Sequence, residues 1–392
     1  MIKKYLFIFF LFAFSMVASA QFTEYKEGDL KLETDFQGYF TNNEFKRHVS
    51  YGYTLGGIRL TPKLSYSFSN NLKFYFGFSG LKYWGTNYYP LYNYTLIPEW
   101  DQTNKRQKLL HILPYLRFEW RISEKMQFVM GNIDKEDRHL LNVALWNPEL
   151  DFAMDYEEGL QLKYHSSHWQ NEVWLNWQNF NYINDVDRES FLFGIAGKLN
   201  SGERKNIFLL NYAFMWQHHG GELDTLTSLP LDHWLNGSFG LAYERKFNNR
   251  FLEKIGLSLD WVFCKSLKND TWFFKAGNGI FANLYARAGK YNLRFAYYYS
   301  EDMMSMYGSP FFSNIAQRNK NEYYLRNQLL NAHFSLSLYS LKQMNISLFT
   351  DLYYKLDKKT NLAKENNNLS ISFGISMDCK TKHLIKNFEN KH

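Results

Sequence analysis

The 392-residue chain contains few residues that cross-link or interrupt a fold, with 2 cysteines, 7 prolines and 23 glycines. Two cysteines are too few for the disulfide framework of a small secreted domain. After residue 20 there is no apolar run near the roughly 20 residues that a transmembrane helix requires. The formal net charge is +7, but residues 1–20 contribute +2 and residues 380–392 contribute +3, which leaves +2. A net charge of +2 on residues 21–379 does not indicate nucleic-acid binding.

Residues 1–20 have the three parts of a secretory signal peptide. Lys3 and Lys4 form a positive start, residues 5–17 form a short apolar segment, and residues 18–20 (Ala-Ser-Ala) form a small-residue cleavage site. We therefore expect the mature chain to begin near Gln21 and to be exported.

Aromatic residues make up 19% of the chain, although its mean hydropathy is −0.44. From Leu30 onward, apolar and polar residues alternate over about ten residues before a turn, and this pattern occurs about sixteen times. One apolar set, for example, is Leu72, Phe74 and Phe76. Alternation with period two predicts strands that have one apolar face. A polar average with many aromatic residues is typical of a membrane β-barrel, where lipid-facing and lumen-facing residues alternate.

Short and long connections alternate along the chain. The short ones are turns such as residues 69–71 and 289–290. The long ones cover about residues 41–54, 82–108, 134–157, 178–189, 217–233, 265–278, 300–324 and 355–367. Outer-membrane barrels have short periplasmic turns and long external loops. We therefore predict an all-β fold, a transmembrane antiparallel up-and-down β-barrel of about 16 strands at residues 21–379. A basic periplasmic tail at residues 380–392 would follow it.

Two prolines and the two cysteines give more local predictions. Pro62 and Pro114 fall inside predicted strands, and we expect bulges or local breaks there because proline has no N–H to donate. Cys264 lies at the external end of its predicted strand, and Cys379 lies at the periplasmic end of the last one. We therefore expect the two thiols not to be bonded to each other.

The signal peptide, strand number, loop alternation and long third loop together resemble the sixteen-stranded porins of Gram-negative outer membranes. The Lys/Asn-rich composition and the absence of a C-terminal aromatic residue suggest a Bacteroidota-type lineage. The resemblance implies location in the cell outer membrane, contact with outer-membrane lipid, passive diffusion of small hydrophilic solutes, and a possible homotrimer. It also implies that the third external loop, residues 134–157, folds inward and narrows the pore.

The same resemblance supplies the candidate site residues. Acidic residues of the third loop would form the pore constriction: Asp134, Glu136, Asp137, Glu149, Asp151 and Asp155. Inward-facing basic residues would form the opposite wall: Arg59, Lys63, Arg117, Arg121, Arg287 and Arg294. Inward acidic positions include Glu172 and Asp351. Charged rings of this kind set selectivity in channels, but pairing of each arginine with a neighbouring carboxylate is an equally good interpretation.

We expect no enzyme activity, no cofactor and no metal site, because the sequence has no G-x-S-x-G, P-loop or zinc signature. Two alternatives stay open. One is a barrel that acts as a binding or secretion-complex component through its long aromatic loops at residues 83–107 and 301–324. The other is a hydrolase at the external rim that uses His218 and His219.

Overall fold

The computed structural model describes most of the chain after residue 21. The described residues are 22, 24–46, 49–85, 110–133, 136–179, 188–202, 205–221, 231–249, 251–268, 274–316, 322–341, 343–357, 359–362 and 368–388. No side chain is described for Glu136, Asp137 or Leu341. No helix among these residues has the length and apolar character needed to cross a membrane.

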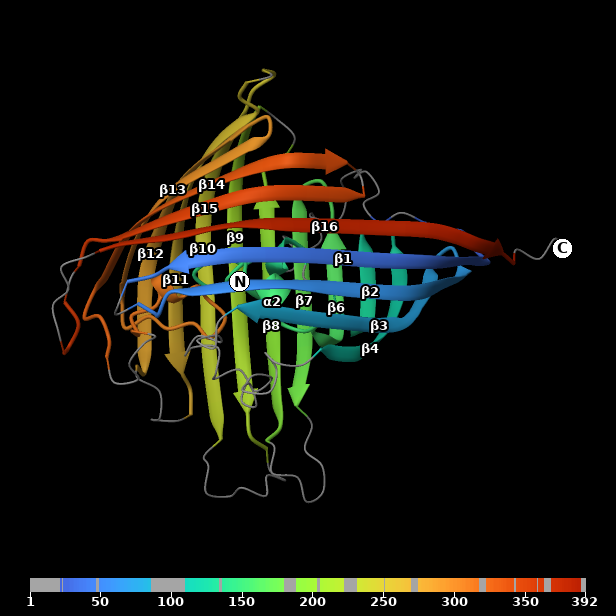
Figure 1. Cartoon of the computed structure of the whole chain (residues 1–392), viewed down its shortest axis with the longest axis horizontal. Coiled ribbons are helices and arrows are strands. Elements are labelled where there is room, and N and C mark those ends of the chain that lie inside the picture. The colour runs from blue at the N-terminus through green and yellow to red at the C-terminus, as the bar shows by residue number, and fades with distance from the viewer. Residues whose placement is uncertain are drawn as a thin grey trace, which may run out of the picture.

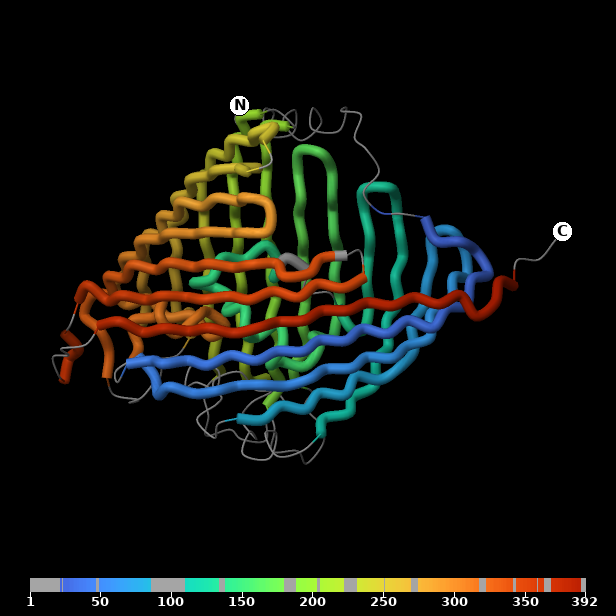
Figure 2. The backbone as a smooth tube through the Cα atoms, turned by 45° about the horizontal axis from the view of Figure 1, so that its top comes forward, coloured from blue at the N-terminus to red at the C-terminus, as the bar shows by residue number. Residues whose placement is uncertain are grey.

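Sixteen antiparallel strands form one closed barrel, as the sequence predicts (Figures 1 and 2). The first eight are β1 (Asp29–Glu44), β2 (Tyr53–Ser69), β3 (Leu72–Gly85), β4 (His111–Ser123), β5 (Met126–Asn132), β6 (Glu158–His165), β7 (Trp169–Asn179) and β8 (Ser190–Asn200). The last eight are β9 (Asn206–His219), β10 (Asp232–Lys246), β11 (Lys254–Ser266), β12 (Ala276–Ala288), β13 (Tyr291–Glu301), β14 (Asn327–Leu341), β15 (Met344–Lys355) and β16 (Leu369–Asn387).

The barrel closes between its first and last strands, which lie side by side in Figure 1. β1 pairs with β16 along its whole length, from Asp29 opposite Asn387 to Glu44 opposite Ile371. Each other strand pairs with its two sequence neighbours. Closure gives every strand a neighbour on both sides, as a sheet in a bilayer requires because lipid offers no partner to backbone N–H and C=O groups.

The predicted alternation of outward and inward side chains is present along the strands. On β11, for example, Leu257, Leu259 and Trp261 are exposed on the outer face, whereas Ser258 and Asp260 are buried inside. The exposed apolar side chains form the lipid-facing surface of the barrel. Contact of such a surface with lipid hydrocarbon holds a barrel in the bilayer.

Each of the two prolines lies at a local break on one side of its strand. The β2–β3 ladder skips Thr61 and Pro62, which is the predicted local break. Pro114 pairs opposite Phe78 on the β3 side without a register shift. On the β5 side it lies in residues 111–116, which have no ladder partner among the described residues, so the predicted local break is present on that side. Cys264 and Cys379 are both free thiols, as predicted.

The last strand is longer than the sequence analysis predicted. β16 continues to Asn387, so most of the expected tail, including Lys380, Lys382 and Lys386, is part of the barrel wall. The β1–β16 ladder continues through Lys382, which pairs opposite Glu33 and places its Nζ 3.4 Å from the buried Glu33 carboxylate. The backbone ladder thus extends the strand beyond the apolar alternation that ends near Met377.

Two external loops fold into the barrel and carry its hydrophobic core. The third loop (residues 133–157) contains a short 3-10 helix η3 (Glu136–Leu140) and the single-turn helix α2 (Leu150–Ala153). The seventh loop (residues 302–326) contains the 3-10 helix η4 (Pro310–Phe312). Leu145 and Trp146 of the third loop and Phe311 of the seventh are buried together with inward residues of the wall. The third loop folds inward as predicted.

A charge placed on the outer face should cost stability according to depth. Leu259 lies at the middle of β11 and is exposed to the lipid side. The Leu259→Arg variant should lose about 2–4 kcal/mol of unfolding free energy, because an arginine at the bilayer midplane is poorly solvated. Leu384→Arg, near the periplasmic end of β16, should lose only about 0–1 kcal/mol. Urea unfolding in lipid vesicles measures both, and equal losses would contradict the orientation of β11.

Candidate functional site

The third loop adopts a backbone conformation that is costly for ordinary residues. Arg138, His139 and Leu140 have φ values of 54°, 52° and 56°, three consecutive residues in the left-handed region. This conformation costs roughly 1–2 kcal/mol per residue when a Cβ is present. Strain of this kind persists only where surrounding contacts hold it, and it gathers at functional sites.

His139 makes the contacts that hold this turn. It is fully buried, and its Nε2 lies 2.6 Å from Glu157 Oε2 at the start of β6. Its Nδ1 contacts the carboxylate of Glu172 on β7. The imidazole also stacks on the Trp174 ring at 4.3 Å and 12°. Both ring nitrogens are therefore occupied, and His139 fastens the third loop to the wall.

The two carboxylates decide the charge of this histidine. Burial by itself lowers the pKa of His139, but the charges of Glu172 and Glu157 and their hydrogen bonds raise it to about 10. His139 is therefore an imidazolium at neutral pH, hydrogen-bonded on both sides. A cation with both nitrogens engaged has no free lone pair, so it acts here as a structural pin rather than as a base.

The seventh loop packs directly on the third. Asn147 N–H donates to Tyr307 O at 2.7 Å, and Ser309 N–H donates to Val143 O at 3.1 Å. The rings of Trp146 and Tyr307 stack at 5.4 Å and 6°. The sequence analysis treated residues 301–324 as a projecting loop, but its described residues 303–316 are buried. These residues offer no outward binding surface of the kind that the binding or secretion alternative needs. Most of the other loop named in that alternative, residues 86–107 of 83–107, lies outside the described residues.

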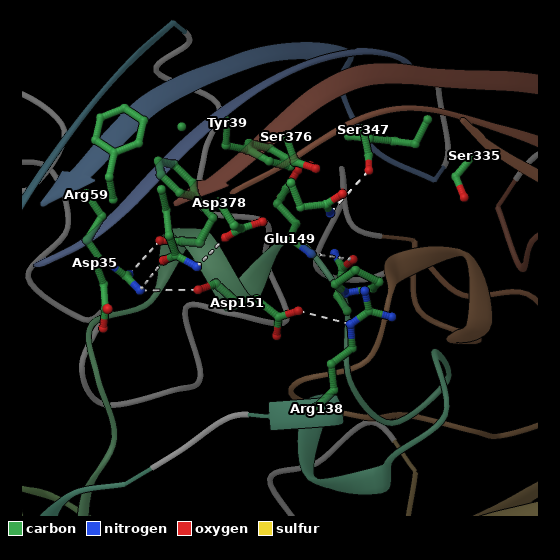
Figure 3. A pocket seen from close by; sticks show the side chains of 18 of the residues that line it. Asp35, Tyr39, Arg59, Arg138, Glu149, Asp151, Ser335, Ser347, Ser376 and Asp378 are labelled. Carbon is green, nitrogen blue, oxygen red and sulfur yellow. Dashed lines mark hydrogen bonds and ion pairs between the residues drawn. The ribbon is translucent and has the colours of Figure 1, made fainter. Parts of the chain in front are cut away.

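A cavity of about 830 Å³ lies in the lumen beside these two loops. Its wall comes from β1–β4 and β13–β16, and the third loop forms one side (Figure 3). The polar lining includes Asp35, Gln37, Arg59, Lys63, Arg117, Glu119, Arg138, Glu149, Asp151, Arg294, His333, Ser335, Ser347, Asp351, Ser372, Ser376, Asp378, Lys380 and Lys382.

Arg59, predicted for the inner wall of a pore, lines the cavity and also clamps the third loop. Its guanidinium donates to the backbone carbonyls of Asp151 at 3.2 Å and Phe152 at 2.6 Å, and also to that of Met154. These carbonyls belong to the end of α2, which has no further helical turn to satisfy them. The guanidinium also lies over the Tyr156 ring at 5.0 Å. Figure 3 shows Arg59 reaching from the wall to the loop.

The other basic residues predicted for the inner wall are mostly paired with carboxylates. Lys63 Nζ lies 2.5 Å from Asp35 Oδ2, Arg117 Nε lies 2.7 Å from Glu119 Oε1, and Arg121 Nη2 lies 2.8 Å from Glu24 Oε1. Arg287 is half exposed near the periplasmic turn and pairs with Glu253 at 3.0 Å, away from the cavity lining. Arg294 lines the cavity.

Of the acidic residues predicted for a constriction, three have described side chains, and two of these, Glu149 and Asp151, line the cavity. Asp134 lies outside the described residues, as do the side chains of Glu136 and Asp137. Glu149 is buried and accepts a hydrogen bond from Tyr53 Oη at 2.8 Å. Asp151 is 2.9 Å from Arg138 Nε at the cavity edge (Figure 3). Asp155 lies 3.6 Å from His111 Nδ1, outside the cavity lining.

A histidine–aspartate pair faces the cavity from β14 and β15. His333 Nδ1 lies 3.0 Å from Asp351 Oδ1, because these residues are directly opposite in the strand register. Asn331 Nδ2 donates to the same oxygen at 3.4 Å. Arg294 donates from Nη2 to Asn331 Oδ1 at 3.0 Å. Among the described residues, the buried Arg294 Nε–H has no hydrogen-bond partner.

In the fifth-loop region, His218 and His233 pack against aromatic rings. His218 stacks on Phe191 at 4.5 Å and meets His233 edge to face at 4.9 Å, at the external ends of their strands. Trp216 Nε1–H donates to His233 Nδ1 at 3.1 Å. In the described part of the chain, no group of three or more His, Cys, Asp or Glu residues is placed to hold a metal ion.

The comparison with protein families decides the relationship. The model of the lipid A 3'-O-deacylase-type family matches residues 22–388. The chain belongs to this family. Because the family is one of enzymes, the expectation of a chain without enzyme activity is wrong. A comparison with curated proteins gave no match.

One solved structure supports the fold, and two others are similar to a lesser degree. OmpTdeltaL8, a loop-deletion mutant of the outer-membrane protein OmpT of Vibrio cholerae, has a TM-score of 0.50 at 9% identity and covers 91% of this chain and 100% of its own. OccAB1 of Acinetobacter baumannii has a TM-score of 0.46 at 10% identity and covers 93% of this chain and 100% of its own. OprD from Pseudomonas aeruginosa has a TM-score of 0.44 at 10% identity and covers 96% of this chain and 100% of its own. The match to OmpTdeltaL8 agrees with the predicted place in the outer membrane of Gram-negative bacteria.

The sequence analysis missed His139 and His333. Their partners Glu172 and Asp351 were recognised as inward-facing, but each pair joins residues that are distant in the chain. One usable signal was available: His333 shares the inward period-two face of β14 with Ser335. No sequence period could identify His139, because it lies on a left-handed turn.

The buried His139 pin should make stability depend on pH. Its pKa is about 10 in the folded chain against an ordinary value of 6.5, so folding takes up a proton between these values. Its stabilising effect should be complete below about pH 6.5 and disappear as pH rises toward 10. Urea unfolding in vesicles at pH 6, 8 and 10 measures this.

The His139→Gln variant should lose about 3–5 kcal/mol at pH 6, because two buried carboxylates lose their cation. The unfolding free energy of the variant should also no longer decrease between pH 6.5 and 10. His168→Gln, in the turn between β6 and β7, is the matched control and should change stability by less than about 0.5 kcal/mol. An unchanged pH dependence in His139→Gln would contradict the imidazolium assignment.

Proposed function

We propose that this chain is an outer-membrane hydrolase that cleaves an ester-linked acyl chain from a lipid A-type glycolipid. The reaction class comes from the family to which the chain belongs. The observation that carries the proposal is the His333–Asp351 pair, at 3.0 Å, on the wall of a cavity of about 830 Å³. Large cavities with a few convergent polar groups are the usual places of ligand binding.

In this proposal His333 is the general base. With its Nδ1–H donated to Asp351, the imidazole carries its lone pair on Nε2. Asp351 holds the ring in this tautomer and stabilises the imidazolium when it forms. Among the described residues, no serine hydroxyl is hydrogen-bonded to His333, so we assign the nucleophile to water. Nε2 takes a proton from this water as its oxygen attacks the ester carbonyl carbon.

Arg294 is the candidate for stabilising the intermediate. Attack moves an electron pair onto the carbonyl oxygen, and a positively charged N–H donor is the kind of group that stabilises this charge. The Nε–H of Arg294 is buried and unpaired among the described residues, while its Nη2 is fixed by Asn331. When the intermediate collapses, the C–O bond breaks and the imidazolium returns its proton to the leaving alkoxide. The products are a carboxylic acid and an alcohol.

A channel for small hydrophilic solutes is the second candidate function. The observation that favours it is the charged lining shared by β1–β4 and β13–β16, which a water-filled passage would need. Arg59 and His139 hold the third loop in the lumen, which favours a narrow passage. The homotrimer that the porin resemblance implies belongs with this candidate and is a prediction.

Removing the base should abolish most of the deacylation. We expect His333→Gln to lower the rate about 10²–10⁴-fold, because general base catalysis typically contributes this factor. Asp351→Asn should also lower the rate, because the imidazole of His333 is then no longer held in the tautomer that carries the proton on Nδ1. The measurement uses the purified protein in vesicles that contain lipid A, with the released fatty acid and the shortened lipid followed by mass spectrometry.

His383→Gln is the matched control, since this histidine lies on β16 outside the cavity lining. It should keep the full rate. A His333→Gln variant with the wild-type rate would refute the role of the base. Wild-type protein that releases no fatty acid from lipid A would refute the proposed function.

Planar bilayers test the second candidate. A narrow passage should give stepwise conductance, and Arg59→Ala should enlarge the steps because it frees the end of α2 from three backbone contacts. Leu384→Arg is the control, since Leu384 is exposed near the periplasmic end of β16 and not part of the cavity lining. An absence of steps in all three proteins would remove the channel as a candidate.

A further inference from the structure

Two neighbouring strands are too short to cross the bilayer. β5 has 7 residues and β6 has 8, whereas the other strands have 11 or more. A membrane-spanning strand needs about 9–11 residues at its usual tilt. At about 3.3 Å per residue and a tilt near 45°, β5 and β6 rise only about 16–19 Å. β5 begins at one periplasmic turn and β6 ends at the next, so the missing part of both strands is in the outer leaflet.

The strands on either side are taller than this pair. The β4–β5 ladder begins at Arg117 opposite Gly131, which leaves residues 111–116 of β4 without a strand partner on that side among the described residues. The β6–β7 ladder likewise ends at Asn176 opposite Gly159, with residues 177–179 of β7 beyond it. The hydrogen-bond ladder of the wall therefore has a gap between the outer parts of β4 and β7.

Side chains replace the missing strand at the lower edge of the gap. The Leu116 N–H of β4 donates to Asn132 Oδ1 at 2.7 Å, and the Glu158 N–H of β6 donates to Asn176 Oδ1 at 3.2 Å. Asn132 Nδ2 donates in turn to Glu158 Oε1 at 3.1 Å. Backbone groups at membrane depth need such partners. These contacts make the gap a built feature of the wall.

The β4 side of the gap is apolar and exposed on both of its faces. Ile112 and Leu113 point to opposite faces of β4, yet 60% and 38% of their surfaces are exposed. Leu116, Met130 and Leu160 are also exposed on the outer face around the lower edge. An apolar surface at outer-leaflet depth fits a hydrocarbon chain, because lipid acyl chains are the surrounding medium there.

Two glycines let the chain leave the wall at this point. Gly131 and Gly159 lie opposite each other at the upper ends of β5 and β6, with φ values of +94° and +154°. A Cβ at Gly131 would lie 2.2 Å from Leu116 O, and one at Gly159 would lie 2.0 Å from Leu175 O. After one further bond, from Ile133 N–H to Glu157 O at 2.9 Å, the third loop turns into the lumen.

The arm of the third loop that returns to β6, residues 154–157, separates the gap from the cavity. Tyr156 of this arm lines the cavity together with Phe152 of α2 and Tyr115 of β4. The Tyr115 and Tyr156 rings meet edge to face at 5.3 Å. At the outer end of β4, His111 Nδ1 lies 3.6 Å from Asp155 Oδ2 of the same arm. This side-chain contact, rather than a backbone ladder, closes the wall here.

We propose that the gap above β5 and β6 is a lateral entry through which an acyl chain of an outer-leaflet lipid passes between β4 and the third-loop arm into the luminal cavity. The inference rests on the proposed function for its substrate class. It adds the route, which brings an insoluble chain from the bilayer to His333 without passage through water. The moving part is the middle of the arm, residues 155–156, between Met154, which Arg59 holds, and Glu157, which His139 holds.

A removable bridge between β4 and the arm tests the entry. The variant carries His111→Cys and Asp155→Cys, and its native cysteines are removed by Cys264→Ala and Cys379→Ala. A short bis-methanethiosulfonate reagent then bridges the two new thiols. Bridging should lower lipid A deacylation in vesicles at least 10-fold, and reductant should restore it. Hydrolysis of a water-soluble ester, p-nitrophenyl butyrate, should stay unchanged. The matched control is Leu257→Cys with Leu284→Cys, a bridged pair across a complete part of the wall.

An unchanged rate on lipid A after bridging would refute the entry while leaving the hydrolase intact. Loss of both activities on bridging would also refute it, because the bridge would then disturb the cavity itself. If the unbridged protein hydrolyses neither substrate, the proposed function fails, and a second measurement decides the entry without any enzyme activity.

That measurement uses vesicles of a phospholipid with a photoactivatable diazirine in its acyl chain. Light should attach label to Tyr115 and Phe152, both buried inside the barrel, and bridging should lower this labelling at least 10-fold. Label confined to outward residues such as Met130 and Leu160 would refute the entry. Peptide mass spectrometry locates the label, and the Leu257–Leu284 bridge should leave it unchanged.

Discussion

Backbone hydrogen bonding in lipid is the constraint on which the rest of this structure depends. A sheet in a bilayer must close, because each unpaired N–H or C=O at membrane depth costs several kcal/mol. Here closure extends β16 through Lys380 and Lys382 to Asn387, beyond the apolar pattern that marks the strand. The same constraint explains Asn132 and Asn176, whose side-chain oxygens accept the N–H groups that lack a strand where β5 and β6 are short.

A closed barrel of sixteen strands encloses more space than its wall residues fill. In this chain the third and seventh loops occupy part of that space and carry the apolar core, while ion pairs such as Lys63–Asp35 and Arg117–Glu119 cover the rest of the wall. Arg59 and His139 fasten the third loop from opposite sides, through backbone carbonyls and through buried carboxylates. The lumen therefore contains a cavity of defined shape. Binding of a ligand requires such a cavity more than passage of a solute does.

Much of the fold follows from local patterns in the sequence. Period-two alternation identifies the strands and their outward faces, because it records only which side of the sheet a residue occupies. The candidate site could not be found in this way. His333 meets Asp351, 18 positions away, only through the register of β14 and β15, and the left-handed turn at His139 opposes the intrinsic preference of three residues. The inward course of the seventh loop depends on Tyr307 packing against Trp146, a contact between loops 161 positions apart.

A hydrolase of membrane lipids has to bring together three environments that exclude one another: hydrocarbon, water and a charged catalytic group. A complete barrel wall keeps hydrocarbon out, and an open pore admits too much water for an arginine to act strongly on a developing charge. The short β5–β6 hairpin lets hydrocarbon approach the lumen, because side chains and a loop, rather than a backbone ladder, close the wall there. The two loops that fill the lumen confine water to a cavity in which Arg294 and His333 face the same space. The short strands and the inward loops are therefore parts of one arrangement.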